Sequence, residues 1–248
     1  MGMIDVHCHL TAPEFEGRVE SLVSEAMASG VKALITSGQG YRDSLNALKL
    51  TSMSGVYASL GVPPYELGGH EEVMELLRKN RNRVVAVGEV GLDYWRAGRD
   101  TWETQRRVFR EFIALAKELD LPLIIHSRSA GKYAIEILLE EGVERAVMHA
   151  FDGAASHAVR AAEHGIMFSI PPSIARSPQK QKLVKRVPLE NLLLESDSPA
   201  LAPNPGQVNH PRNVKVSAEW ISRLKGIELG KVLEALWENT LRVFELRV

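Results

Sequence analysis

The sequence contains a single cysteine and no long apolar run. One cysteine, Cys8, excludes an intrachain disulfide and any cysteine-rich zinc module. No segment approaches the roughly 18 consecutive apolar residues of a membrane-spanning helix. The first residues also lack the basic region and apolar stretch of a secretory signal. We therefore expect a soluble, cytoplasmic protein that does not associate with membranes.

An excess of charge of one sign is also absent. The 30 Lys and Arg residues nearly balance the 31 Asp and Glu residues, which leaves a net charge of -1. A protein that coats duplex DNA usually has a basic surface, so any contact with nucleic acid here has to come from a local cluster. Residues 78–83 and 180–186 are two basic clusters, and the simpler interpretation of both is a solvated helix end. No obligate protein partner is indicated.

The chain contains no linker rich in Pro, Ser or Gly. Short β-rich apolar runs alternate instead with longer segments of helical period. The expected strands are residues 3–8, 31–36, 56–60, 84–87, 122–125, 146–149, 166–170 and 192–195. The expected helices include residues 14–29, 71–79, 101–119, 131–140 and 155–164, and a helical tail over residues 216–246.

This alternation predicts an α/β fold, a single (β/α)8 TIM-type barrel with a C-terminal helical tail, as one domain over residues 1–248. The intervening helices are long enough to join parallel strands, and barrels of this type use about 250 residues. The main alternative is a doubly wound open sheet. Its glycine-rich G-x-G-x-x-G signature is absent, because Thr11, Ala12 and Pro13 follow the first strand.

Two histidines lie at the carboxyl end of the first expected strand, the end at which barrels build active sites. His7 and His9 flank Cys8, and the alternation of side chains along a strand puts both imidazoles on one side. Cys8 then faces the other side as a small buried hydrophobe. Considered alone, the pair is more simply two unrelated histidines.

Four later strand ends each carry a further residue that can bind a metal. Glu89 follows residues 84–87, and a buried carboxylate there needs a cation or a hydrogen-bond partner. His126 and His149 end the runs at 122–125 and 146–148, and Asp197 closes the run at 192–196. Each could be an ordinary polar residue when taken singly, but the six together indicate a metal site.

Four imidazoles and two carboxylates suit borderline divalent ions such as Zn²⁺ or Mn²⁺, with Mg²⁺ as a further candidate. Two such ions, about 3.5–4 Å apart, could lower the pKa of a water and stabilise the attacking and leaving oxygens. Asp197 is the candidate to accept the proton of the attacking water. The pattern therefore predicts a hydrolase with two divalent metal ions.

Motifs along nearly the whole chain resemble those of the TatD family of metal-dependent deoxyribonucleases, within the amidohydrolase-like barrels. They occur in the same order as in that family. The matching motifs are DVHCHL at 5–10, GEVGLDY at 88–94, LPLIIHSR at 121–128, HAFDG at 149–153, LESDSP at 194–199, RN at 212–213 and ENT at 238–240, with Phe244.

The resemblance implies a role for each ligand. The two histidines of the first strand would bind one metal, and His126 and His149 the second. Glu89 would bridge the metals as a catalytic carboxylate, and Asp197 would activate the nucleophilic water. The implied reaction is phosphodiester hydrolysis of single-stranded or frayed DNA ends, in the 3′ to 5′ direction.

Departures from the family pattern leave the substrate less certain than the chemistry. Pro63 stands where the family commonly has His, and proline cannot donate a hydrogen bond to a phosphate. Val6, Thr11 and Lys132 also differ from the usual residues. Because related barrels hydrolyse other bonds, the alternative is a two-metal hydrolase of an ester, amide or aminoacyl bond outside nucleic acid. The complete ligand set disfavours a non-catalytic, metal-stabilised scaffold.

Five residues are candidates for binding the substrate. Arg128 follows His126 and could hold a phosphate oxygen, although a structural salt bridge is equally expected. Tyr94 and Trp95 could stack on an unpaired base, with loop packing as the simpler interpretation. Arg212 and His210 follow the last strand, Arg212 as a substrate contact and His210 as an accessory acid.

Overall fold

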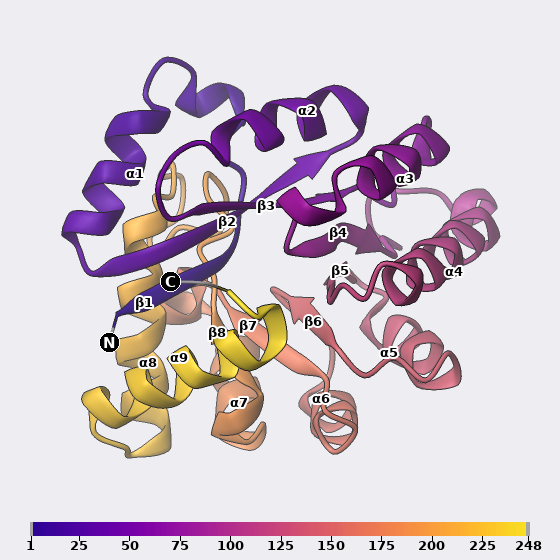
Figure 1. The fold of residues 1–248 in the computed structure, drawn as a ribbon. Helices are drawn as coiled ribbons and strands as arrows, with labels where there is room; N and C mark the ends of the chain where they lie inside the picture. Colours follow the sequence, from indigo (N-terminus) through magenta and orange to yellow (C-terminus); the bar gives the residue numbers. More distant parts are fainter. Residues whose placement is uncertain (1, 247–248) are drawn as a thin grey trace.

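Eight parallel strands form one sheet in which β1 to β8 lie in sequence order. The computed structural model describes residues 2–246. The sheet curls into a nearly closed barrel with helices on its outside (Figure 1), so the predicted TIM-type α/β barrel is confirmed. The strands are β1 Met3–Cys8, β2 Val31–Gln39, β3 Val56–Gly61, β4 Ala86–Gly91, β5 Leu123–His126, β6 Ala146–His149, β7 Met167–Ile170 and β8 Leu192–Leu194.

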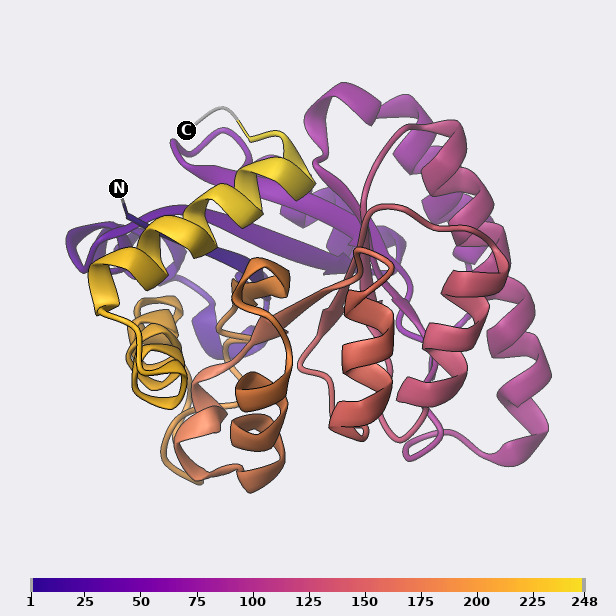
Figure 2. The same ribbon diagram turned by 90° about the horizontal axis from the view of Figure 1, so that it is seen from below.

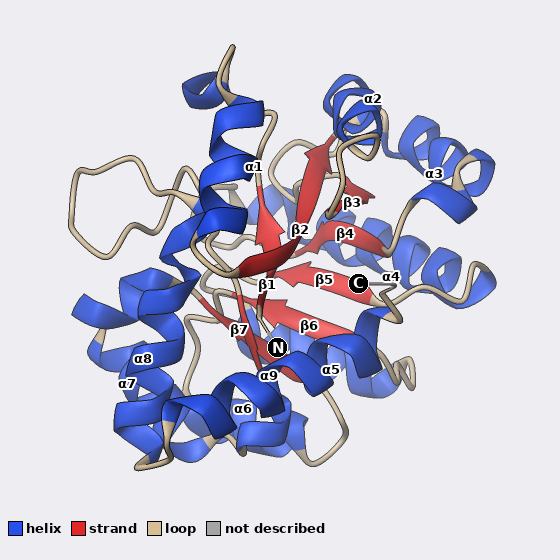
Figure 3. Cartoon of the chain, turned by 60° about the vertical axis from the view of Figure 1, so that its left-hand side comes forward, coloured by secondary structure: helices blue, strands red, loops and turns tan. Residues whose placement is uncertain are grey.

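Helices cover the outer surface of the strands (Figure 3). They are α1 Val19–Ala28, α2 Tyr41–Leu50, α3 His70–Lys79, α4 Trp102–Glu118, α5 Gly131–Glu140, α6 Ala155–Ala162, α7 Pro178–Arg186, α8 Val214–Lys225 and α9 Leu229–Phe244. Within residues 2–246, no helix combines the length and the apolarity needed to cross a membrane.

The predicted helical segments at the two ends of the chain are each divided in the structure. The expected helix over 14–29 begins only at Val19, after a 3₁₀ turn at Pro13–Phe15. Gly17 between them has a φ of 72°, a left-handed conformation that interrupts a helix. The helical tail is present as α8 and α9, and Gly226, with a φ of 66°, ends α8. α9 then packs against β1 and β8 (Figure 2).

The interior of the barrel is apolar beneath its carboxyl end. Ile124, Val147 and Leu193 belong to one buried cluster that also contains Phe244 of α9. In the sequence they precede His126, His149 and Glu195 by two residues, and Glu195 directly follows β8. Because side chains alternate along a strand, each of these three apolar residues is followed, on the same side and nearer the carboxyl end, by a polar residue.

The barrel is closed by a seam between its first and last strands. Within the described residues, no ladder pairs β8 with β1. Instead, the backbone N–H of Asp197 donates to the carbonyl of His7 at 2.9 Å, and the N–H of His9 donates to the carbonyl of Ser198 at 2.8 Å. The seam therefore lies among residues that the sequence predicts as metal ligands.

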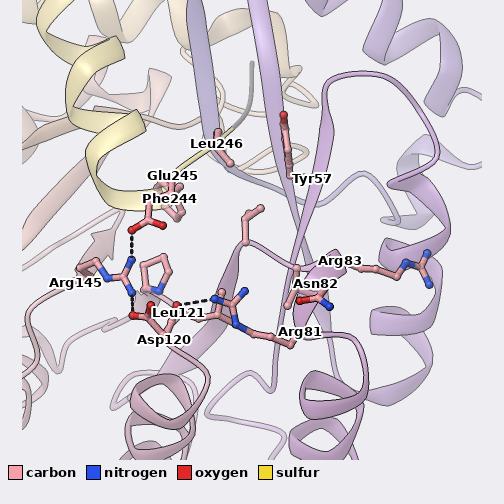
Figure 4. Close-up of a pocket in the computed structure, with 13 residues that line it drawn as sticks. Tyr57, Arg81, Asn82, Arg83, Asp120, Leu121, Arg145, Phe244, Glu245 and Leu246 are labelled. Carbon is pink, nitrogen blue, oxygen red and sulfur yellow. Dashed lines mark hydrogen bonds and ion pairs between the residues drawn. The ribbon is translucent and has the colours of Figure 1, made fainter.

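A cavity of about 520 Å³ lies at the opposite face, where β4, β5 and β6 begin (Figure 4). In it, Arg145 donates to the carboxylates of Asp120 and Glu245, the latter at 2.8 Å. Arg81 donates to the backbone carbonyls of Leu119 and Asp120. These contacts join the end of the chain, after α9, to the loop that precedes β5.

Candidate metal centre

Two imidazoles at the carboxyl end of β1, His7 in the strand and His9 directly after it, point toward the same pair of carboxylates. The Nε2 atoms of His7 and His9 lie 3.4 and 3.3 Å from Oδ1 of Asp197. They lie 3.7 and 3.8 Å from Oε2 of Glu89. Cys8 between them is buried in the apolar core. The expected alternation along this strand is therefore confirmed.

Glu89 lies within β4, which corrects the expectation that it follows a strand ending at residue 87. The strand begins two residues later than expected and continues through Gly88 and Gly91. Glycines are needed here because the backbones of neighbouring strands pass too close for a Cβ atom. A Cβ atom on Gly61 would lie 2.3 Å from the Glu89 carbonyl oxygen, and one on Gly91 would lie 2.1 Å from the His126 carbonyl oxygen. These glycines let β3, β4 and β5 approach one another at the site.

The two oxygens of the Glu89 carboxylate face different imidazoles. Oε1 lies 2.5 Å from Nδ1 of His126 and 3.2 Å from Nε2 of His149. Oε2 faces the two histidines of β1 and also accepts a hydrogen bond from Nε2 of Gln39 at 3.1 Å. The side chain of Glu89 is only 4% exposed. Glu89 is therefore placed as a carboxylate shared between two pairs of histidines.

The six predicted ligands gather at one point, in three overlapping groups whose ligand atoms lie within 4.8 Å of one another. The groups are His7, His9 and Glu89; His7, His149 and Asp197; and Glu89, His126 and His149. Nε2 of His7 is buried and has no hydrogen-bond partner. The lone pair of a buried imidazole nitrogen that faces two carboxylates can coordinate a divalent cation. These residues therefore fit a metal ion.

Two further carboxylates support the histidines from behind, and the sequence analysis assigned them no role. Oδ2 of Asp93 lies 2.9 Å from Nε2 of His126, the nitrogen that faces away from Glu89. Oε2 of Glu195 lies 3.4 Å from Nδ1 of His149 and accepts a hydrogen bond from the Ser169 hydroxyl. Carboxylates in this position fix the orientation and tautomer of metal-binding histidines.

The polar side chains of the first strand, Asp5 and His7, are also buried. Nδ1 of His7 lies 3.0 Å from the Ser37 hydroxyl. Asp5 is fully buried, and its Oδ1 accepts hydrogen bonds from the backbone N–H groups of Ser196 and His7. Burial raises the pKa of Asp5 to about 8, although these hydrogen bonds act in the opposite direction.

Electrostatics in the cluster favour anionic carboxylates. Burial alone would raise the pKa of Glu89, but His149 and His126 hold it well below its usual value. Asp197 behaves in the same way, because His7 and His9 outweigh the effect of burial and lower its pKa. Burial would lower the pKa of His126, but the carboxylates of Glu89 and Asp93 raise it to about 9. Without a metal, protonated His126 and His149 supply the positive charge that the carboxylates need, whereas burial lowers the pKa of His7.

Three of the predicted substrate contacts lie on loops that follow β4 and β5. Trp95 is 64% exposed, and the Arg128 guanidinium lies 3.6 Å from the centre of its ring. Tyr94 instead stacks on Trp102 with ring centres 3.9 Å apart, and its hydroxyl accepts a hydrogen bond from Arg106. Trp95 and Arg128 are thus available at the surface, whereas Tyr94 is packed against α4.

The other two predicted contacts are not brought into the cluster. Nε2 of His210 and Nη1 of Arg212 lie 3.2 and 2.9 Å from the same carboxylate oxygen of Glu25, on α1. Tyr65, which the sequence analysis did not consider, does lie beside the cluster. Its ring centre is 6.1 Å from that of His126. Tyr65 follows the unusual Pro63 by two residues. This proximity is the only feature of the sequence that could have indicated that Tyr65 lies near the site.

A barrel with four imidazoles and two carboxylates converging at its carboxyl end defines the class of metal-dependent hydrolases. The model of the family described as TatD related DNase matches residues 4–245. The chain belongs to this family and is a metal-dependent hydrolase.

Named relatives support the same assignment. The chain is 38% identical to the human protein named deoxyribonuclease TATDN3, over 98% of this chain and 95% of the relative. It is 32% identical to an uncharacterised metal-dependent hydrolase, YabD, of Bacillus subtilis, over 98% of this chain and 99% of the relative. The crystal structure of YjjV, a TatD homologue from Escherichia coli, superposes with a TM-score of 0.91 at 30% identity, covering 99% of this chain and 98% of YjjV.

Proposed function

We propose that the protein is a phosphodiesterase that hydrolyses single-stranded or frayed DNA ends in the 3′ to 5′ direction, using two divalent metal ions (Zn²⁺, Mn²⁺ or Mg²⁺). The observation that carries the proposal is the Glu89 carboxylate, whose two oxygens each face a different pair of histidines. The deoxyribonuclease name of the human relative supports DNA as the substrate. We further propose that residues 1–248 form one cytoplasmic domain with no obligate protein partner.

The proposed ligands divide into two sets. His7 and His9 would hold one ion, the histidines of β5 and β6 the other, and Glu89 would be shared. Two ions bound in this way would lower the pKa of a water and offset the charge that develops on the phosphoryl oxygens. Oδ1 of Asp197 lies 3.4 and 3.3 Å from Nε2 of His7 and His9, so its carboxylate would lie beside a water held at the metals. Asp197 can therefore accept the proton of the attacking water and pass it to the leaving oxygen.

The substrate would enter across the loops after β4 and β5. The exposed ring of Trp95 offers a surface on which an unpaired base can stack. Arg128, which lies against that ring, offers a planar guanidinium that suits a phosphate oxygen. Tyr94 would support this loop through its stacking on Trp102, and we propose no direct contact for Arg212 or His210, which are held by Glu25.

The alternative substrate is an ester, amide or aminoacyl linkage outside nucleic acid. Pro63 favours this possibility, because it stands where the family commonly has His and cannot donate a hydrogen bond to a phosphate. The same metal centre would serve either substrate class, so only the surrounding loops distinguish them.

The test uses metal-stripped protein to which Mg²⁺, Mn²⁺ or Zn²⁺ is restored. The substrates are a single-stranded DNA oligonucleotide labelled at its 5′ end and a carboxyl ester. Stepwise shortening from the 3′ end by the parent, but not by Asp197→Asn, is the expected result. Ester cleavage without loss of DNA would overturn the nuclease proposal and favour the alternative. DNA cleavage that persists in Asp197→Asn, with normal circular dichroism, would overturn the role of Asp197.

A further inference from the structure

Lys180 corrects the expectation that residues 180–186 are a solvated helix end. It is only 7% exposed and lies in the first turn of α7. Its ammonium donates to the backbone carbonyls of Ala150 at 2.9 Å and Phe151 at 3.4 Å. No carboxylate among the described residues lies within ion-pair distance of it.

This location is unfavourable for a cation in two respects. The amino end of a helix carries a partial positive charge, which repels an ammonium in the first turn of α7. Removing a charge from water is costly, and burial accordingly lowers the pKa of Lys180, although the charges of Glu195, Asp152 and Asp197 act in the opposite direction. Two carbonyl groups compensate for part of this cost. A bound anion would compensate for more.

Lys180 lines a cavity of about 410 Å³ beside the metal centre, together with His149 and Asp197. Ser127 lines the same cavity, and its hydroxyl is buried without a hydrogen-bond partner. A buried hydroxyl without a protein partner is free to donate a hydrogen bond to a bound group. The exposed guanidinium of Arg128 supplies a third donor at the rim.

One acidic residue besides the centre's own Asp197 also lines the cavity. Asp152 is exposed, and both of its carboxylate oxygens accept from the backbone N–H of Ser129, at 3.0 and 3.3 Å. Its charge is therefore turned partly toward the loop and open to water, whereas the charge of Lys180 is buried. Lys180 and Arg128 therefore bring two positive charges to the cavity, against the carboxylates of Asp152 and of Asp197, which belongs to the metal centre.

We propose that this cavity, through Lys180, Ser127 and Arg128, binds a second phosphate group of the substrate, next to the one that is hydrolysed. The inference rests on the proposed phosphodiesterase function. A phosphate offers several acceptor oxygens to three converging donors, and it neutralises a buried cation better than a neutral group does. The cavity volume is within the range of small-ligand sites, about 300–1,000 Å³, which suits a nucleotide. The enzyme would thus favour nucleotides that carry phosphate on both the 3′ and 5′ sides.

The test measures binding, by calorimetry, to the metal-loaded protein. The probes are deoxyadenosine 3′,5′-bisphosphate and the corresponding 3′- and 5′-monophosphates. We expect the parent to bind the bisphosphate about tenfold or more tightly than the better monophosphate, because charge-assisted hydrogen bonds are the stronger ones. In Lys180→Met this ratio should fall to about one, and Lys180→Arg should restore part of it. Lys182→Met, which removes an exposed lysine from the same helix, should retain the parental ratio.

Two results would overturn the proposal. The first is a parental ratio near one. The second is an unchanged ratio in Lys180→Met with all three affinities reduced equally, which is the result expected if Lys180 only holds the loop after β6. If Lys180→Met does not fold, Ser127→Ala and Arg128→Ala are measured instead. A smaller ratio in both supports the site, and a parental ratio in both overturns it.

The binding measurement does not depend on catalysis, so the two proposals can fail separately. A protein that cleaves DNA but shows no preference for the bisphosphate would retain the nuclease function and lose the second phosphate site. A protein that prefers the bisphosphate but cleaves no DNA would lose the nuclease function, and the cavity would remain a phosphate site. Inorganic phosphate, added as a competitor, should reduce the bisphosphate preference in the parent and leave the Lys180→Met ratio unchanged.

Discussion

The two faces of the barrel both contain a cavity and charged side chains, but the charges differ in their exposure to water. At the face where strands begin, the side chains of Asp120 and Glu245 are 83% and 73% exposed beside Arg145. At the opposite face, Glu89 and Asp197 are 4% and 13% exposed. Exposed charges are solvated and screened, whereas buried charges must be compensated by specific partners. The degree of burial, and not the size of the cavity, therefore distinguishes the reactive face.

The largest effect is expected for Glu89→Gln, which keeps the shape of the side chain but removes the shared charge. Breaking a buried ionic interaction costs about 3–5 kcal/mol, which corresponds to a loss of at least about 100-fold in metal affinity. Turnover at limiting metal should fall in parallel. Metal content and kcat/KM are the measurements, with Glu245→Gln at the other face as the control. Equal losses in both variants would contradict the contrast between the faces.

A smaller loss is expected for the carboxylates behind the histidines. Asp93→Asn and Glu195→Gln should each reduce metal affinity or activity by about 10- to 100-fold, because the histidines lose the groups that orient them. Circular dichroism should be unchanged. Metal titration in a competitive chelator assay measures the effect. If neither substitution changes metal affinity, the orienting role is incorrect.

Trp95→Ala tests whether the exposed ring binds bases. Loss of one stacked base costs about 1–3 kcal/mol, so KM for single-stranded DNA should rise by about fivefold or more, with a smaller change in kcat. Trp95→Phe retains an aromatic surface and should be affected less. A KM for DNA that is the same in the parent and both variants would exclude stacking at this position.

Asp5 predicts a pH dependence of stability in the metal-free protein. Its folded-state pKa, about 8, lies above its ordinary value of 3.8, so the folded state binds more protons than the unfolded state between these values. The stability that Asp5 contributes is therefore greatest below about pH 4 and decreases as pH rises to 8, by up to about 1.4 kcal/mol per pH unit. Asp5→Asn should remove this slope. Urea midpoints at pH 6 and 7 measure it, and equal slopes in parent and variant would contradict the prediction.

The smallest effect is expected for Arg145→Met at the face where strands begin. The carboxylates of its two ion pairs are largely exposed, so the free energy of unfolding should fall by only about 1 kcal/mol or less. Activity should remain within twofold of the parent, about the scatter of such assays. Thermal unfolding and kcat/KM are the measurements. A large loss of activity would show that this face also contributes to function.

The sequence was sufficient to predict the barrel and to locate the ligands, because both depend on short periodic patterns. His7 and His9 alternate along one strand, and His126 and His149 end apolar runs, so the parallel topology brings them to one face. Glu89 is predicted to lie beyond its strand because the glycines around it interrupt the run of apolar residues by which the strand is recognised.

Residues that depend on loops or on distant contacts could not be predicted in this way. Asp93 and Tyr65 lie on loops whose path is set by tertiary packing, and Arg212 reaches Glu25, which is 187 residues away in the sequence. Lys180 was expected to be solvated because its neighbours in the chain are charged, and the sequence does not reveal which elements pack against it. The buried residues Leu183 and Val184 on the same helix show that one face of α7 is turned inward.

The seam between β1 and β8 has a consequence for the order in which the chain becomes functional during synthesis. The histidines at the end of β1 leave the ribosome well before Asp197 and the backbone groups that bond to His7 and His9, which follow β8. Until then, the ligand set is incomplete and the barrel cannot close. A nascent chain that has not yet passed β8 therefore cannot assemble the full centre, and it should lack hydrolytic activity.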